Sequence, residues 1–256
     1  MPSAIKHDLE LSSKGLVSIL VEVQGSDEAQ LEHFLWKTFP DNGCFASVGV
    51  HVPIPESQGI PHGAVIGVDG TLLWAGNPLA DSKKIEELIA AELVKVKKGW
   101  GTTAESRKVR AALFGKGDLA GAAALVAAMP DGEERTALQA EVDARYASAK
   151  KAISTLQEQG RWIDAQAAAK NLQKSVGTNA TWAGEVTPLV AEFDSESSKA
   201  EIALEKKLEK ITKQLRDKKL DAAIKGLQGL TKADGPTNKV GERAARMLKA
   251  LETPLK

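Results

Sequence analysis

The stretch GIPHGAVIGVDGTLLWAGNP, residues 59–78, determines which fold the sequence predicts. Two short apolar runs flank an Asp-Gly pair at 69–70, and this pair favours the tight turn of a β-hairpin. An Ile-Pro step at 60–61 precedes the first run. The stretch therefore predicts an antiparallel hairpin over 64–75 that follows a proline-containing loop.

The segments on either side of the hairpin predict further α/β structure. Gly15–Gln24 is rich in β-branched and apolar residues on both faces, which is typical of a strand covered on two sides. Ser26 is a candidate N-cap for the helix that follows, and a short strand is expected at Phe45–Val50. After the hairpin, Asp81 or Ser82 begins an amphipathic helix.

The order of these elements resembles the C-terminal two thirds of a thioredoxin-like (redoxin) domain. The matching features are a strand, a helix, a long loop, the Gly-Ile-Pro step, the hairpin with its Asp-Gly turn and a terminal helix. The resemblance implies that the Ile60–Pro61 peptide bond is cis, which is a minority state of X-Pro bonds in folded proteins. It also implies that Ile60, Pro61 and His62 form a substrate-binding turn, because the family holds an extended substrate segment there.

The same resemblance leaves the chain without catalytic residues. Residues 1–23 are similar to the family segment that begins at the proline of the active-site helix, with Pro2 matching that proline and Leu16 entering the next strand. In the family a Cys-x-x-Cys pair precedes this proline, whereas Cys44 is the single cysteine of the chain and is interpreted as a structural thiol. Because a second thiol must release the mixed disulfide formed by the first, we expect this chain to be redox-inactive.

Two explanations for the missing cysteine pair stay open: an N-terminally truncated oxidoreductase, or a protein that has lost its active site. The first predicts thiol-disulfide oxidoreduction in a longer chain. The alternative is a non-catalytic binding or scaffold module, in which an apolar groove near Ile54, Ile60 and Trp74 holds extended peptides while the helical tail recruits a partner.

Composition and motifs exclude several other classes of function. The four histidines show no i, i+4 pairing and there is one cysteine, so no metal site is expected, and no cofactor is expected because phosphate-binding glycine motifs are lacking. A protein or peptide partner is expected, and nucleic acid is not. No apolar run is long enough to span a bilayer. The localisation is left open: we expect a cytoplasmic protein as the sequence stands, or an exported or periplasmic one if an upstream segment is missing.

Charge and composition change near residue 100. Residues 1–96 contain 13 Asp and Glu but only six Lys and no Arg, whereas every Arg follows residue 106. This asymmetry predicts two domains, a thioredoxin-like domain without active-site cysteines over 1–98 and an α-helical hairpin domain over 103–256. The predicted fold class is therefore an α/β thioredoxin-like sandwich, incomplete at its N-terminus, followed by an all-α domain.

The second domain contains three similar helix starts. In each, a large apolar residue follows a polar turn, and an alanine one turn later permits close helix approach. The three pairs are Leu119 with Ala122, Trp162 with Ala165, and Leu220 with Ala223. They resemble tetratricopeptide-type units, although the intervals of 43 and 58 residues are unequal.

Two longer segments, 132–160 and 195–217, each predict one long helix. The second places Leu204, Leu208, Ile211 and Leu215 along one side, which fits a coiled coil or a bundle. Two interpretations stay open: the helices bind a partner or another copy of the chain, giving a homo-oligomer, or they pack on the predicted sheet and stabilise it.

Overall fold

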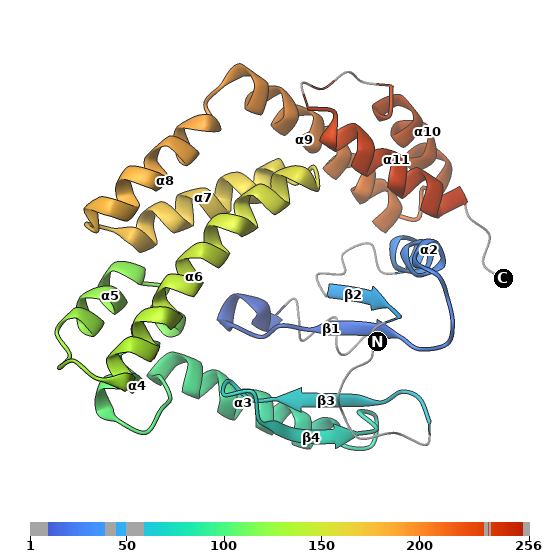
Figure 1. Ribbon diagram of the computed structural model, residues 1–256. Helices are drawn as coiled ribbons and strands as arrows, with labels where there is room; N and C mark the ends of the chain where they lie inside the picture. Colours follow the sequence, from blue (N-terminus) through green and yellow to red (C-terminus); the bar gives the residue numbers. More distant parts are fainter. Residues whose placement is uncertain (1–9, 39–44, 50–58, 233–234, 236, 253–256) are drawn as a thin grey trace. The chain divides into compact units, whose positions relative to one another are not determined.

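The computed structural model describes residues 10–38, 45–49, 59–232, 235 and 237–252 (Figure 1). Most of these residues are helical. The strands form two separate two-stranded sheets, a parallel one of β1 (Ile19–Glu22) with β2 (Phe45–Val48) and an antiparallel one of β3 (Gly63–Ile66) with β4 (Leu72–Gly76). The predicted thioredoxin-like α/β sandwich is therefore wrong, because no sheet joins the four strands in the described part of the chain.

The error has its origin in the apolar run Gly15–Gln24. Within this run only Ile19–Glu22 forms a strand, and β2 is its one strand neighbour among the described residues. Val17, Ile19 and Val23 have exposed fractions of 64%, 65% and 66%, so the run is not covered on two sides. An apolar run alone does not show what covers it, and in this chain the buried apolar side chains lie mainly between helices.

The chain divides into two compact units, and each combines segments that are far apart in the sequence. The first unit contains residues 1–18 and 50–144, and the second contains residues 19–49 and 145–256. These compact units do not test the predicted domains 1–98 and 103–256, which stay a prediction.

The first unit consists of the β3–β4 hairpin and a series of helices. A short 3-10 helix, η1 (Ser12–Lys14), precedes them in the chain. After the hairpin come α3 (Ser82–Lys98), α4 (Ala104–Arg110), the π-helical segment η2 (Ala111–Lys116), α5 (Leu119–Ala127) and the beginning of α6 (Glu133–Glu158). Its buried core includes Val109, Leu113, Leu119, Val126 and Leu138.

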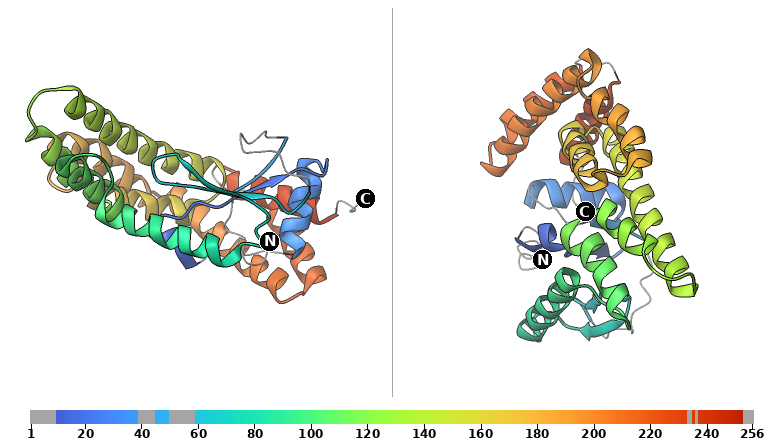
Figure 2. Two further views of the ribbon diagram at one scale, coloured as in Figure 1. Left: turned by 90° about the horizontal axis from the view of Figure 1, so that it is seen from below. Right: turned by 90° about the vertical axis from the view of Figure 1, so that its left-hand side faces the viewer.

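The second unit contains the parallel β1–β2 pair and the remaining helices. These are α2 (Glu28–Thr38), the rest of α6, α7 (Trp162–Val176), α8 (Ala180–Glu192), α9 (Glu196–Arg216), α10 (Leu220–Leu230) and α11 (Lys239–Glu252). Helix α9 packs against α7, α10 and α11, and α2 lies against α11 (Figures 1 and 2). Asp27, rather than the predicted Ser26, caps α2, because its Oδ1 accepts a hydrogen bond from the N–H of Gln30 at 2.9 Å.

The helices predicted after residue 103 are confirmed, whereas their likeness to tetratricopeptide-type units stays a prediction. The segments expected as long helices are α6 and α9. Of the four residues predicted along one side of α9, three are buried and Leu204 is half-buried; the buried ones are Leu208, Ile211 and Leu215. Helices α5, α7 and α10 begin at the three large apolar residues, and the alanines that follow one turn later are all 0% exposed. Small side chains at these positions let neighbouring helices approach closely.

The turn before each of these three helices has the same backbone feature. A residue with positive φ ends the preceding helix: Gly117 at 66°, Gly160 at 68° and Lys218 at 57°. At Gly160 and Lys218 the next N–H donates to the carbonyl five residues earlier, at 2.8 Å and 2.9 Å, which is the long hydrogen bond of a Schellman motif. These turns fix where the next helix begins.

Candidate functional site

Ile60, Pro61 and His62 form the turn immediately before β3. The Ile60–Pro61 peptide bond is cis, as the resemblance predicted. Ile60 is 59% exposed, Pro61 is exposed and His62 is half-buried. That these residues bind a substrate stays a prediction, but the turn does present an apolar side chain to solvent.

Trp74 anchors the hairpin beside this turn. The tryptophan is buried, and a Cβ built at Gly63 or Gly76 would lie 3.7 Å or 3.2 Å from its ring. Its Nε1 donates a hydrogen bond to Oδ2 of Asp81, the residue before α3, at 3.0 Å. Trp74 is thus a packing anchor and does not line an exposed groove. Ile54, the third residue of the predicted groove, lies outside the described residues.

The tip of the hairpin is fixed to α3 by a carboxylate. Glu92 is buried, and its Oε2 accepts a hydrogen bond from the N–H of Val68 at 2.9 Å, while Lys95 approaches its Oε1 at 2.5 Å. Within the turn, the N–H of Thr71 donates to Oδ1 of Asp69 at 3.0 Å and chiefly this bond lowers the pKa of the aspartate. The predicted Asp-Gly turn is therefore held from within and from the helix.

The hairpin also exposes apolar side chains and strand edges. Ile66 and Leu72 are partners across the ladder and are 58% and 42% exposed. In the part of the chain that the structure describes, β3 and β4 pair only with each other, so the sheet leaves one edge of each strand unused. Such edges can accept another extended segment.

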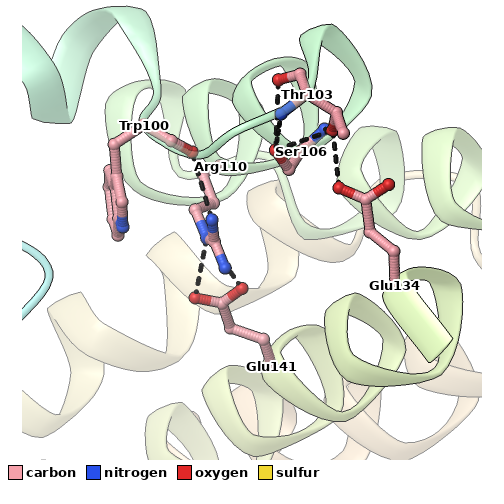
Figure 3. Close-up of polar contacts among 6 residues, drawn as sticks. All are labelled: Trp100, Thr103, Ser106, Arg110, Glu134 and Glu141. Atoms are coloured by element: carbon pink, nitrogen blue, oxygen red, sulfur yellow. Dashed lines mark hydrogen bonds and ion pairs between the residues drawn. The ribbon is translucent and has the colours of Figure 1, made fainter.

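A second polar cluster in the first unit surrounds Arg110 of α4 (Figure 3). Its Nε donates to both carboxylate oxygens of Glu141 at 3.1 Å and 3.0 Å, and its Nη1 donates to the carbonyl of Trp100 at 3.1 Å. The guanidinium also lies 5.5 Å from the centroid of the Trp100 ring. Arg110 therefore joins α4, α6 and the loop after α3.

The same figure shows the cap of α4. Thr103 and Ser106 form a reciprocal capping box, and Oγ1 of Thr103 lies 2.5 Å from Oε1 of Glu134 on α6 (Figure 3). These polar groups bond to one another. We therefore interpret the whole cluster as structural.

The second unit buries two carboxylates on α9. Oε2 of Glu205 accepts a hydrogen bond from the N–H of Ile163 at 2.6 Å, and its Oε1 accepts one from Nη1 of Arg243 at 3.1 Å. Burial is the main cause that raises the pKa of Glu205. One turn earlier, Oε1 of Glu201 accepts from the N–H and the Oγ1 of Thr237 at 2.7 Å and 2.9 Å.

Sequence reasoning missed these two glutamates, although a signal was present. They lie four residues apart on the side of α9 that also carries Leu208, Ile211 and Leu215. An acidic residue within an apolar stripe indicates a buried, partnered charge. Oε2 of Glu201 is buried without a hydrogen-bond partner among the described residues.

Of the remaining histidines, Pro2 and Cys44, the structure describes only His33. His33 is buried on α2, and its Nδ1 lies 2.6 Å from the carbonyl of Ala250 in the last turn of α11. Pro2, His7, Cys44 and His51 lie outside the described residues. No group of three or more His, Cys, Asp or Glu within the described ranges could hold a metal ion.

Comparison with known proteins does not assign the chain to a family. No family model, no curated protein and no solved structure matches it. The resemblances to thioredoxin-like domains and to tetratricopeptide-type units therefore rest on the sequence alone. Among the helices that the structure describes, none combines the length and the apolar character needed to cross a membrane.

Proposed function

We propose that the protein is a non-catalytic binding module that holds an extended peptide at the Ile60–His62 turn and the adjoining hairpin. The observation that carries this proposal is the 59% exposure of Ile60 beside Pro61, at the start of a strand with an edge that the sheet leaves unused. Solvent-exposed isoleucine next to a strand edge that pairs with no other strand among the described residues offers both apolar contact and hydrogen bonds.

The chemistry of such a complex is β-strand addition. Backbone N–H and C=O groups of the peptide pair with the strand edge, and side chains on alternate residues reach the surface beside the edge. We expect one apolar peptide side chain to contact Ile60 and Pro61, with His62 as a neighbouring polar group. Affinity in the micromolar range is reasonable for a short peptide, because the peptide loses conformational entropy on binding.

The hairpin is suited to this role because it is fixed on both ends. Trp74 and Asp81 hold the open end against the start of α3, and Glu92 holds the tip. A binding edge that is already ordered avoids part of the entropic cost of association. In this proposal the helical tail recruits a further partner, which makes the whole chain a scaffold.

Thiol-disulfide oxidoreduction in a longer chain is a second candidate. The order of hairpin and terminal helix after the Gly-Ile-Pro step favours it, since β3, β4 and α3 occur where the resemblance implies them. It requires a cysteine pair that these 256 residues do not contain. The chain itself is expected to show no disulfide reductase activity towards insulin in the presence of dithiothreitol beyond the reductant alone.

The test is a selection from a random peptide library followed by fluorescence anisotropy with the selected peptides. We expect Ile60→Asp to weaken binding at least about tenfold, because it places a charge against an apolar peptide side chain. Leu125→Asp is the matched control, since Leu125 is also exposed but lies on α5. Equal affinities for wild type and Ile60→Asp, or no peptide bound below millimolar concentration, would reject the proposal.

A further inference from the structure

The charged side chains of α9 are sorted between two faces. The two carboxylates Glu201 and Glu205 are buried and bonded to neighbouring segments. All five lysines of the helix are exposed. Glu205 forms its ion pair with Arg243 and not with a lysine of α9. The buried carboxylates of α9 therefore do not neutralise its exposed lysines by direct ion pairing.

The exposed lysines form a row along the helix. Lys199, Lys206, Lys210 and Lys213 fall within about 60° of one another around the helix axis and extend over about 21 Å. Lys199 is paired with Glu196 at 3.0 Å, which leaves the other three as the centre of the row. Lys207 is exposed beside them.

The row continues into the turn between α9 and α10. Two more lysines lie there, at positions where the backbone favours glycine and a capping residue such as Ser, Thr, Asp or Asn. Lys218 occupies the left-handed position that glycine occupies in the other two turns. Lys219 is the N-cap of α10, makes no side-chain cap and places a positive charge at the positive end of the helix dipole. Residues that break local preferences in this way often serve a function.

We define the basic row as six exposed residues, Lys206, Lys207, Lys210, Lys213, Lys218 and Lys219. Two exposed acids lie among them, Glu209 and Asp217, and Asp217 lies 3.9 Å from Nζ of Lys219, so six positive charges stand against two negative ones. Leu220, which follows directly, is 36% exposed, whereas the corresponding Leu119 and Trp162 are buried.

We propose that the basic row binds the surface of an anionic lipid bilayer. Lysine ammonium groups are point charges that attract dense negative charge without directional recognition, and each adds to binding near an anionic membrane. The half-exposed Leu220 next to Lys219 matches a bilayer interface, where apolar side chains enter the acyl boundary while charged groups remain at the headgroups.

Other anionic partners fit this surface less well. Residues 196–232 contain no aromatic side chain, so bases of single-stranded nucleic acid have no stacking platform there. A protein partner would find no aromatic anchor on this surface, and most of its basic residues are lysines, which are depleted in protein interfaces. The phosphates of duplex DNA would attract the lysines, but Leu220 would add nothing to DNA binding. A substitution of Leu220 therefore distinguishes duplex DNA from an anionic bilayer.

The experiment is flotation of the full chain with vesicles of phosphatidylcholine alone or with added phosphatidylserine. We expect binding only to the anionic vesicles and a decrease on raising the salt concentration. A triple variant, Lys206→Glu, Lys210→Glu and Lys213→Glu, should reduce the partition coefficient by about a hundredfold or more. Leu220→Ser should reduce vesicle binding severalfold and leave any duplex DNA binding unchanged.

The matched control is a second triple variant with the same change in net charge at three exposed lysines of α3. Its substitutions are Lys83→Glu, Lys84→Glu and Lys98→Glu. It should retain most of the vesicle binding, and circular dichroism verifies that both triple variants stay helical. Equal binding to neutral vesicles, equal loss in the two triple variants, or binding of a duplex DNA without binding of anionic vesicles would each overturn the proposal.

Discussion

The Glu205 carboxylate on α9 accepts a hydrogen bond from the N–H of Ile163 at 2.6 Å, so one helix caps the N-terminus of another. Arg161, at the N-cap position of α7, makes no side-chain capping bond. Arg243 on α11 donates to the other oxygen of Glu205 and to the carbonyl of Gly160. One buried carboxylate thereby joins α7, α9 and α11.

Removal of this carboxylate should destabilise the protein strongly. Glu205→Ala leaves the largely buried Arg243 guanidinium and the Ile163 N–H without their partner, and we expect a loss of about 3 kcal/mol in the free energy of unfolding. Glu209→Ala, on the exposed face of the same helix, should change this free energy by less than about 0.5 kcal/mol. Urea denaturation followed by circular dichroism measures both, and similar values for the two variants would contradict the capping role.

The raised pKa of Glu205 also predicts a pH dependence. A carboxyl with a raised pKa in the folded state binds a proton more tightly when folded, so its contribution to stability is fully present below the ordinary value of 4.5 and is lost as pH rises through the folded pKa. The free energy of unfolding of wild type relative to Glu205→Gln should therefore increase as pH falls through this window. A difference that is constant with pH would refute the assignment.

The turn residues predict substitutions with opposite effects. Lys218→Gly should stabilise the protein by about 0.5 to 1 kcal/mol, because glycine relieves the left-handed conformation at φ 57°. Gly160→Ala should destabilise it by roughly 2 to 4 kcal/mol, because the added Cβ would lie 2.5 Å from the carbonyl oxygen of Lys239. Thermal unfolding of both variants checks the two signs, and a stabilising Gly160→Ala would be incompatible with the close approach described above.

Tyr146 is the single tyrosine of the chain, which permits a direct titration. Burial, followed by the hydrogen bond from its hydroxyl to Glu185 at 2.9 Å, raises the pKa of Tyr146 to about 12. Absorbance of the phenolate near 295 nm should show this pKa, and Glu185→Gln should lower it because the negative charge is removed. A wild-type titration at the ordinary value of 10 would show that the phenol is exposed.

Replacement of Arg110 should destabilise the first unit. Arg110→Ala removes the paired hydrogen bonds to Glu141 and the contact with Trp100, and we expect a loss of about 1 to 3 kcal/mol. Arg107→Ala is the control, because Arg107 is exposed and its one side-chain bond to the described residues is a 3.4 Å bond to the carbonyl of Gly101. Equal effects in urea denaturation would indicate that the Arg110 contacts contribute little.

Local patterns in the sequence predicted most individual elements. The Asp-Gly pair at 69–70 identified the hairpin, and the apolar periodicity of α6 and α9 identified the long helices. Each of these signals acts over a few residues through turn geometry or one helical face. The starts of α5, α7 and α10 were predicted for the same reason.

The arrangement of those elements could not be read from the same patterns. The apolar residues around the strand Ile19–Glu22 led to the prediction that this strand is covered on both sides. The partners of a strand come from distant segments, and periodicity does not identify them. The site residues show the same limit. Ile60, Pro61 and His62 are consecutive and lie on one turn, and their role in binding stays a prediction, whereas the contacts of Glu201 and Glu205 depend on residues 36 to 42 positions away.

The contact between α2 and α11 has a consequence for synthesis of the protein. His33 bonds to Ala250, which is 217 residues later in the chain. At ribosomal rates of roughly 5 to 20 residues per second, α2 waits roughly ten to forty seconds for the helix against which it packs. During that interval α11 does not yet cover the apolar side of α2, so the second unit completes its folding only after α11 has left the ribosome.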